Sequence, residues 1–372
     1  MHISCSTIQR AARNSIEYSR QYIKTIIRSG VFKRNQHRAY IELEEVNVPR
    51  RLNQVCWLLR QAGYGILVRI GLRAFIGFNQ IGKDSFHNPD TFLSPFKDSR
   101  GTLRVSDSDL LIGDGNTKIL HVDYNFFPPE TEKFKGNCYI PIMFHPSLMN
   151  EDTYAHAEGL AKNTDRKVLM LFAGSLSRDL YNRQIIRDHF GLNTRNEIID
   201  AVEKQSESRD LLYKPRHFRE FEERKDSGEL RKKIVVIDTG VCRIPQERWL
   251  DILSEVAFFI AAPGISMPFC HNLPESMAVG AIPVIQFGDL LYPPLENRRN
   301  CFAFSDLDEL KNVMMNLIPH LEQDEIREMR ERVVQYHKDY LSPESFVLKM
   351  REFEQDSRQE LRLFMARRIY ND

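Results

Sequence analysis

Three apolar runs separated by helical segments constrain the fold of this chain more than any other feature of its sequence. The runs are KKIVVID at 232–238, AFFIAAPG at 257–264 and AIPVIQF at 281–287. Each is continuously apolar over its centre, which is typical of strands covered on both faces. Because helical segments alternate with them, the pattern predicts a βαβαβ series that forms one parallel sheet.

The same alternation occurs elsewhere, so we expect an α/β protein with two domains. A strand is predicted from Val168 to Ala173, with a helix at 181–190, and the first half of the chain alternates in the same way. A length of 372 residues fits about two domains, and a net charge of +1 argues against a nucleic-acid partner. We expect Rossmann-like domains at 1–155 and 165–340, and a C-terminal helix at 341–372 that packs back on the first domain.

Three further segments carry local predictions. The charged residues 203–232 lack strong periodicity, so we expect a surface excursion there. Ser305 is expected to cap the helix that follows it. Ser342 and Pro343 are expected to open a long helix toward Arg367.

The cysteines and the chain's hydropathy exclude other classes of protein. The 6 cysteines have no zinc-site spacing, so we expect neither a disulfide framework nor a bound metal. No run approaches the roughly 18 apolar residues of a membrane span, which predicts a cytoplasmic protein. The basic, weakly amphipathic segment 8–38 is expected to be a solvated helix on the domain, with peripheral contact to anionic lipid as the alternative.

The segment FAGSLSRDLYNRQIIRD at 172–188 combines a strand end, small residues and arginines. Gly174 and Ser175 would let the backbone approach a ligand, and the guanidinium groups of Arg178 and Arg183 suit diphosphate oxygens. The alternative is a tight turn with solvated arginines that pair with nearby aspartates.

The segment APGISMPFCHNLPESMAVGAIPVI at 261–284 is the most informative. A strand ends at Pro263 and Gly264, and Glu275 and Ser276 stand at the start of the next helix. A carboxylate there is stabilised by the helix dipole and can accept hydrogen bonds from two hydroxyl groups, such as those of a nucleotide's ribose. The alternative is a glutamate that merely caps the first turn.

This segment resembles the carboxyl-terminal motif of exostosin-like glycosyltransferases. The matching positions are Pro263, Gly264, Ser266, Glu275, Ser276, Met277, Gly280, Ile282, Pro283 and Val284. The earlier LFAGSL and NRQIIRDHF segments also resemble that family, so the similarity covers most of 167–290. The chain departs from the family at Asn272, where an arginine is common, and in a loop one residue longer between Gly264 and Glu275.

The resemblance implies a GT-B architecture, with two Rossmann-like domains facing across a cleft and additional C-terminal helices. The second domain would bind a nucleotide-sugar donor, with UDP favoured, and the first would bind a glycan or glycolipid acceptor. Glu275 and Ser276 would hold the ribose, and Gly174, Ser175, Arg178 and Arg183 would meet the diphosphate in place of a metal ion. The implied enzyme is an inverting hexosyl- or pentosyltransferase of polysaccharide or glycoconjugate synthesis, without metal or other cofactor.

Inversion also requires a base that deprotonates the acceptor hydroxyl. Asp114, Asp123 and His145 are candidates, because each is expected in a loop after a strand of the first domain. A turn residue is the alternative for Asp114 and an ordinary loop histidine for His145. His271 and Asn272, together with Pro263, Gly264 and Ser266, are expected to line the sugar and phosphates.

Two other functions fit the same architecture. A nucleotide-sugar 2-epimerase shares the cleft and the ribose-binding carboxylate, but converts its substrate without an acceptor. A non-catalytic scaffold would bind a nucleotide or glycan without turnover, and the missing arginine at Asn272 favours that alternative.

Overall fold

The computed structural model describes residues 23–24, 37–42, 49–70, 75, 91–94, 103–107, 117–124, 134–181 and 184–366. Contacts divide the chain into two compact units, each built around its own sheet. Unit 1 comprises Met1–Tyr124, Gly136–Cys138 and Pro343–Phe364, and unit 2 comprises Asn125–Lys135, Tyr139–Ser342 and Met365–Asp372. The predicted α/β fold with two sheets is confirmed, whereas a cleft between the domains stays a prediction.

Unit 1 contains a sheet with the strand order β3-β2-β1-β4-β5-β13-β6. The neighbouring strands from β3 to β13 pair in parallel. Two helices, α2 (Pro49–Gln61) and α14 (Pro343–Gln355), pack against each other. The strands are β1 (Arg38–Glu42), β2 (Gly65–Arg69), β3 (Thr91–Ser94), β4 (Leu103–Ser106), β5 (Lys118–Asp123), β6 (Cys138–Tyr139) and β13 (Glu360–Phe364).

The C-terminal segment joins the sheet of unit 1 as a strand. The predicted helix toward Arg367 ends at Gln355, and β13 follows it and pairs with β5. Leu361 and Leu363 are fully buried while the residues before and between them are not, which is the period of a strand and not of a helix. The end of α14 is fixed by Lys118, whose ammonium donates to three carbonyl oxygens at the helix end, including that of Asp356 at 2.8 Å.

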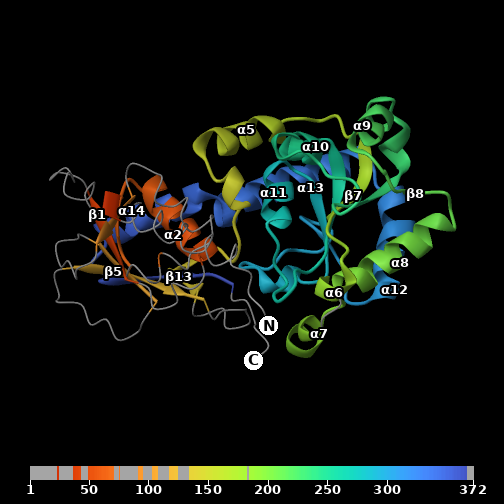
Figure 1. Ribbon diagram of the computed structural model, residues 1–372. Helices are drawn as coiled ribbons and strands as arrows, with labels where there is room; N and C mark the ends of the chain where they lie inside the picture. The colour runs from red at the N-terminus through yellow and green to blue at the C-terminus, as the bar shows by residue number, and fades with distance from the viewer. Residues whose placement is uncertain are drawn as a thin grey trace, which may run out of the picture. The chain divides into compact units, whose positions relative to one another are not determined.

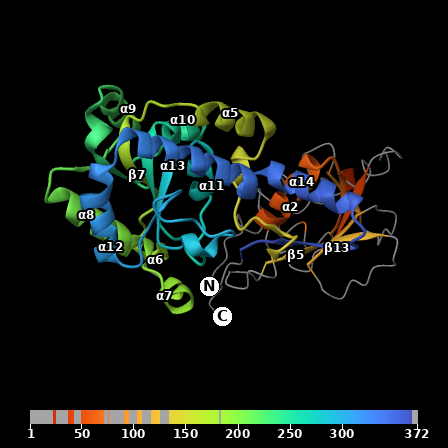
Figure 2. The same ribbon diagram turned by 180° about the vertical axis from the view of Figure 1, so that it is seen from behind.

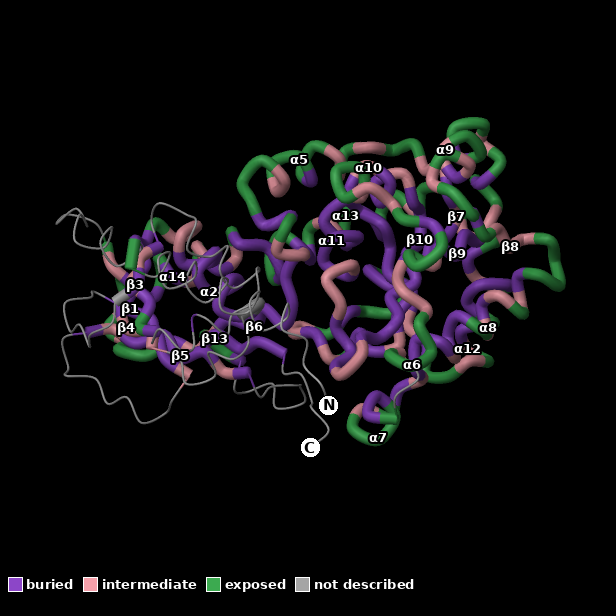
Figure 3. The backbone as a smooth tube through the Cα atoms, in the orientation of Figure 1, coloured by how far each residue is buried: buried purple, intermediate pink, exposed green. Residues whose placement is uncertain are grey.

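Unit 2 contains a parallel sheet with the order β12-β11-β10-β7-β9-β8. Its strands are β7 (Val168–Gly174), β8 (Leu212–Tyr213), β9 (Ile234–Asp238), β10 (Val256–Ala261), β11 (Ile282–Ile285) and β12 (Phe302–Ala303). The strands predicted in the βαβαβ series are therefore confirmed as β9, β10 and β11. Their central residues are buried, as Figure 3 shows for β10.

Helices cover both faces of this sheet. Helices α5, α10, α11 and α13 contact one another in one layer, and α8 and α12 pack together on the other side of the strands (Figures 1 and 2). The helices are α5 (Glu151–Ala161), α6 (Arg178–Tyr181), α7 (Ile185–Phe190), α8 (Arg195–Glu207), α9 (Phe218–Asp226), α10 (Trp249–Ser254), α11 (Asn272–Ala278), α12 (Leu307–Asn312) and α13 (Gln323–Tyr336). The short 3-10 and π segments are η2 (Pro146–Leu148), η3 (Glu229–Lys232), η4 (Gln246–Arg248), η5 (Gly288–Leu290), η6 (Val313–Leu317), η7 (Ile318–His320) and η8 (His337–Leu341).

Several predictions for unit 2 need correction. The segment 203–232 lies mostly at the surface, as predicted, but it contains the end of α8 and α9, and Phe221 is fully buried. The predicted helix 181–190 is divided into α6 and α7. The cap of α12 is Asp306, whose carboxylate accepts the Glu309 N–H at 2.8 Å, and not Ser305. The long continuous segment of unit 2 runs from Tyr139 to Ser342, so the change of domain predicted between residues 155 and 165 falls inside that unit.

The strand order of unit 2 reverses between β7 and β10. From β7 the chain continues to β8 and β9 on one side, and then crosses to β10 on the other. In open parallel sheets, ligands bind beyond the carboxyl ends of the strands at such a switch point. A ligand site is therefore expected at the loops that follow β7 and β10.

Candidate functional site

The loop after β7 is anchored to the end of β9. The carbonyl oxygen of Gly174 accepts the Thr239 N–H at 3.1 Å, and Asp238 Oδ1 accepts the N–H groups of Leu176 at 3.2 Å and Gly240 at 3.0 Å. Gly174 and Ser175 are half-buried. The small residues predicted to approach a ligand thus lie in a loop with a fixed backbone.

The loop after β10 folds tightly around Gly264. Its N–H donates to the carbonyl oxygens of Met267 at 3.1 Å and Pro268 at 3.2 Å. A Cβ at this position would lie 2.7 Å from the Met267 oxygen, a distance that no side chain tolerates. Pro263 and Gly264 are buried, and Ser266 is half-buried. The Pro-Gly pair therefore shapes the loop, and glycine is required by close approach of the backbone.

Helix α11 begins directly beside this loop. Asn272 donates from Nδ2 to the carbonyl oxygen of Ala173 at 2.9 Å, which ties the helix to the end of β7. Asn272 thus has a structural contact of its own. Ser276 is fully buried, and its hydroxyl donates to the Leu273 carbonyl oxygen at 2.9 Å within the same helix.

Glu275 is fully buried in the first turn of α11. Its Oε1 accepts the backbone N–H of His145 at 2.7 Å, and its Oε2 accepts the indole N–H of Trp249 at 2.6 Å. Both donors belong to unit 2, so the carboxylate links α11 to α10 and to the segment before η2. Contact with a ribose requires these groups to move, and the ribose role of Glu275 stays a prediction.

His145 and His271 lie together near Glu275. Their ring centroids are 5.0 Å apart, with the ring planes at 65°. His145 Nδ1 lies 2.5 Å from the Ser147 hydroxyl, and both histidines are half-buried. The sequence predicts His145 in the first domain, but it lies in unit 2, where it is a neighbour of a residue predicted to line the donor.

The remaining predicted residues have other surroundings or lie outside the described part of the chain. Asp123 ends β5 in unit 1, where its carboxylate is 3.8 Å from Arg362 Nη1. Arg178 is exposed and forms a two-pronged pair with Asp200, at 3.2 and 3.0 Å. Asp114 and Arg183 lie outside the described residues.

Arg195, the first residue of α8, is a site residue that the sequence reasoning missed. It is only 5% exposed. Its Nε donates to the Pro263 carbonyl oxygen at 3.0 Å, its Nη1 to the Ser175 carbonyl oxygen at 3.2 Å, and its Nη2 to the Cys270 sulfur at 3.1 Å. The guanidinium also covers the ring of Tyr181 at 3.7 Å from the centroid. One side chain therefore joins the loops after β7 and β10.

The sequence contains a signal for this position. Thr194 and Glu197 form a capping box, in which each side chain accepts the other's backbone N–H, so a helix start at 195 is recognisable from the T-x-x-E spacing.

A small cavity lies next to Arg195. Its lining consists of Phe172, Arg195, Phe259, Ile260, Ala261, Ala262, Cys270, Asn272, Leu273 and Phe287.

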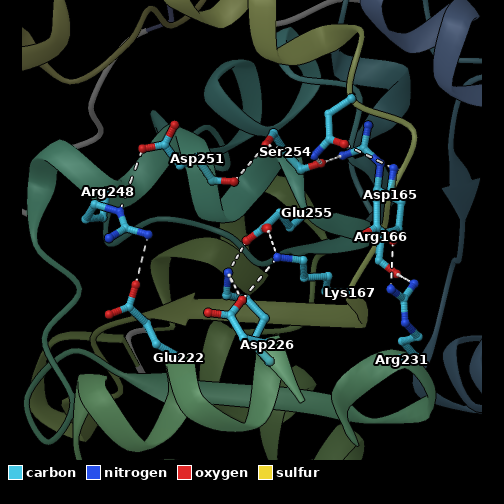
Figure 4. Close-up of polar contacts among 12 residues, drawn as sticks. Asp165, Arg166, Lys167, Glu222, Asp226, Arg231, Arg248, Asp251, Ser254 and Glu255 are labelled. Atoms are coloured by element: carbon cyan, nitrogen blue, oxygen red, sulfur yellow. Dashed lines mark hydrogen bonds and ion pairs between the residues drawn. The ribbon is translucent and has the colours of Figure 1, made fainter. Parts of the chain in front are cut away.

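The opposite, amino edge of the same sheet has a different character (Figure 4). Lys225 is 2% exposed and pairs with Glu255 and with Asp226, the latter at 3.2 Å. Lys167 bonds the same two carboxylates, at 2.6 Å to Glu255 and 3.1 Å to Asp226. Arg166 donates to carbonyl oxygens at the ends of α10 and α11, among them Val279 at 3.1 Å. The lysines and carboxylates at this edge are thus matched by one another, and Arg166 is held by carbonyl oxygens.

Two general features concern ions and membranes. Within the described part of the chain, no group of three or more His, Cys, Asp or Glu side chains is arranged to hold a metal ion. Among the same residues, no helix has the length and apolar character needed to cross a bilayer.

No protein-family model matches the sequence, and no curated protein matches it either. Solved structures with a similar fold are glycosyltransferases and related enzymes. A glycosyltransferase from Rickettsia africae is 12% identical, with a TM-score of 0.47, and the match covers 87% of this chain and 99% of that one. HepE from Anabaena, in complex with UDP and glucose, is 10% identical, with a TM-score of 0.42 and coverage of 87% and 100%. Sucrose-phosphate synthase from Thermosynechococcus elongatus is 12% identical, with a TM-score of 0.41 and coverage of 86% and 98%.

Proposed function

We propose that this chain is a glycosyltransferase of the exostosin-like type, with GT-B architecture. It would transfer a hexosyl or pentosyl group from a nucleotide-sugar donor, with UDP favoured, to a glycan or glycolipid acceptor. The observation that carries the proposal is the meeting of two loops at the switch point of unit 2. These loops, after β7 and β10, contain the residues of the sequence resemblance.

The donor would bind over these two loops. Gly174 and Ser175 present a closely anchored backbone, and the loop after β10 is held in a tight turn at Gly264. His271 and Ser266 are both half-buried, and they would line the sugar and phosphates. We assign no metal to this site, because guanidinium groups can stabilise the charge of a departing diphosphate.

The reaction would proceed by inversion at the anomeric carbon. A base removes the proton of the acceptor hydroxyl, and the oxygen attacks C1 of the donor sugar. The bond between C1 and the phosphate oxygen breaks, and its electron pair leaves with the nucleoside diphosphate. His145 is our preferred base, since it lies in the same unit as the donor loops and 5.0 Å from His271. Asp123 and Asp114 are the alternatives.

The proposal is tested in two stages. A thermal-shift screen with UDP, GDP, CMP and dTDP identifies the nucleotide, and UDP is expected to raise the midpoint most. Incubation of the matching nucleotide sugar with glycan and glycolipid acceptors then measures transfer, with EDTA present to test metal independence. Conversion of the donor without an acceptor would indicate an epimerase. Binding without turnover across the acceptor panel would indicate a scaffold, and either result contradicts the proposal.

His145→Gln tests the base. The amide keeps much of the side-chain volume and leaves the backbone N–H on Glu275 in place, but it cannot take a proton at neutral pH. We expect donor affinity to stay within about twofold and the transfer rate to fall roughly 100-fold, the range of general-base catalysis. Asp123→Asn is the matched variant in unit 1, and a loss of rate only there would move the base to that residue.

A further inference from the structure

Arg195 carries a buried charge that has no carboxylate partner among its contacts in the described part of the chain. Its contacts within the described part of the chain are two carbonyl oxygens, a thiol and two aromatic rings, Phe172 and Tyr181. None of them is a carboxylate. A buried charge is costly unless an opposite charge or strong hydrogen bonds offset it.

The position of Arg195 in α8 makes its charge harder to explain by stability alone. It is the first helical residue, where the unpaired N–H groups and the helix dipole already give a partial positive charge. Cations are favoured at the other end of a helix. A residue whose charge is unfavourable for the stability of its own helix is expected at a functional position.

The three hydrogen bonds of the Arg195 guanidinium connect the loops after β7 and β10. They use Nε, Nη1 and Nη2, so the planar fork spans from Ser175 after β7 to Pro263 and Cys270 after β10. A guanidinium has five N–H groups, so hydrogen atoms remain for a further acceptor. The small cavity at its side is lined by Arg195 as its one charged residue.

We propose that Arg195 is the positioning residue of the donor site, and that the diphosphate of the donor supplies the anion that its buried charge lacks. Its fork holds the two loops at a fixed spacing, and its charge favours ligands with phosphate groups over the nucleoside alone. This inference rests on the proposed function, since it assigns a residue within that site. It replaces Arg178 as the cation of the site, because Arg178 is exposed and already pairs with Asp200.

The test compares ligands that differ only in charge. Calorimetry measures the affinity of the full chain for uridine, UDP and inorganic pyrophosphate, in the wild type, Arg195→Gln and Arg195→Lys. Arg195→Gln should weaken UDP and pyrophosphate by roughly tenfold or more, the value of one charge-assisted hydrogen bond, and uridine by less than about twofold. Arg195→Lys keeps the charge without the fork, so its UDP affinity should lie between those of Arg195→Gln and the wild type. Arg178→Gln is the matched control, and it should change none of the three affinities.

Equal losses for uridine and UDP would show a purely structural arginine and overturn the inference, as would unchanged UDP affinity. If Arg195→Gln does not fold, Arg195→Lys carries the comparison alone, because it removes the planar fork that joins the two loops and keeps only a point charge. The same charge-selective loss is expected, and its absence again overturns the inference. Failure of the proposed function looks different. In that case pyrophosphate binding still depends on Arg195, but no nucleotide sugar is turned over with any acceptor.

Discussion

Arg166, which is half-buried, and Arg195, which is buried, lie at opposite edges of the sheet of unit 2, and their surroundings differ. At the amino edge, Arg166 donates to carbonyl oxygens at the carboxyl ends of α10 and α11, where helix dipoles are negative. Burial lowers the pKa of its guanidinium to about 9, with the nearby Arg330 lowering it further and Glu255 opposing the shift. At the carboxyl edge, Arg195 stands at the positive end of α8.

The amino edge of the sheet is structural, and the carboxyl edge is the candidate site. At the amino edge, lysines and carboxylates saturate each other, so nothing there requires a ligand (Figure 4). At the carboxyl edge, the loops are built from glycine, proline and serine, and a single buried cation joins them. The carboxyl edge, where parallel sheets bind their ligands, is the one where a buried cation joins two loops.

The largest effect on stability is expected from Lys225→Met at the amino edge. The substitution leaves Glu255 without its most buried partner, and removing one member of a buried ion pair costs about 3 kcal/mol or more. Urea unfolding measures the loss, while the relative affinities for UDP and uridine should not change. Arg219→Ala, which removes an exposed pair with Glu223 on the same helix, is the control and should leave the unfolding midpoint unchanged. A loss for Lys225→Met no larger than that of the control would contradict a saturated, structural amino edge.

The second prediction concerns Gly264 at the carboxyl edge. A methyl group there would lie 2.7 Å from the Met267 carbonyl oxygen, so Gly264→Ala must displace the loop. We expect UDP affinity to fall roughly tenfold or more, which corresponds to about 1.4 kcal/mol of binding free energy. Gly159→Ala is the control. Its Cβ would meet no atom within 4 Å on the exposed face of α5, and it should stabilise the helix by about 0.5–1 kcal/mol. Unchanged affinity in Gly264→Ala would place the ligand elsewhere.

Glu275 gives the third prediction. Trp249→Phe removes the N–H that Oε2 accepts and keeps an aromatic ring next to Phe259. A buried carboxylate that loses a donor costs about 1–3 kcal/mol of stability. Chemical unfolding of Trp249→Phe, Glu275→Gln and the double variant measures the coupling between the two side chains. Additive effects would mean that the indole does not hold the carboxylate.

The smallest effect is the pH dependence of Asp226. Hydrogen bonds from Lys167 and then Lys225 lower the pKa of its carboxyl below the ordinary 3.8. The unfolded chain therefore binds the proton at higher pH than the folded one, and the contribution of Asp226 to stability is present above about pH 4 and is lost as the pH falls further. Melting curves of wild type and Asp226→Asn should differ at pH 6, and the difference should shrink as the pH falls below about 4. A difference that persists unchanged at pH 3 would contradict this.

The sequence predicts the sheet of unit 2 well, because continuous apolar runs such as those of β10 and β11 have few other solutions. It fails where tertiary context decides. The C-terminal ELRLF segment becomes β13 because its alternating leucines complete the sheet of unit 1, although its charge pattern continues a helix equally well. Burial explains the missed Arg195. In the sequence it is one of many arginines beside acidic residues, and only the folded chain shows which arginine is enclosed.

The same limit applies to the candidate site. The motif identifies Glu275, but the donors from His145 and Trp249 come from segments that are distant along the chain. Spacing alone does not reveal that both oxygens of the carboxylate are already engaged.

Hydrogen exchange of the full chain, with and without UDP, tests the central claim most directly. Binding should protect the loop at 174–177 and the loop at 262–271, which lie at the carboxyl edge of the sheet in unit 2. Peptides at the amino edge, covering 165–167 and 225–232, should exchange at the same rate in both conditions. Protection at the amino edge, or none at the two loops while UDP binds, would contradict the account.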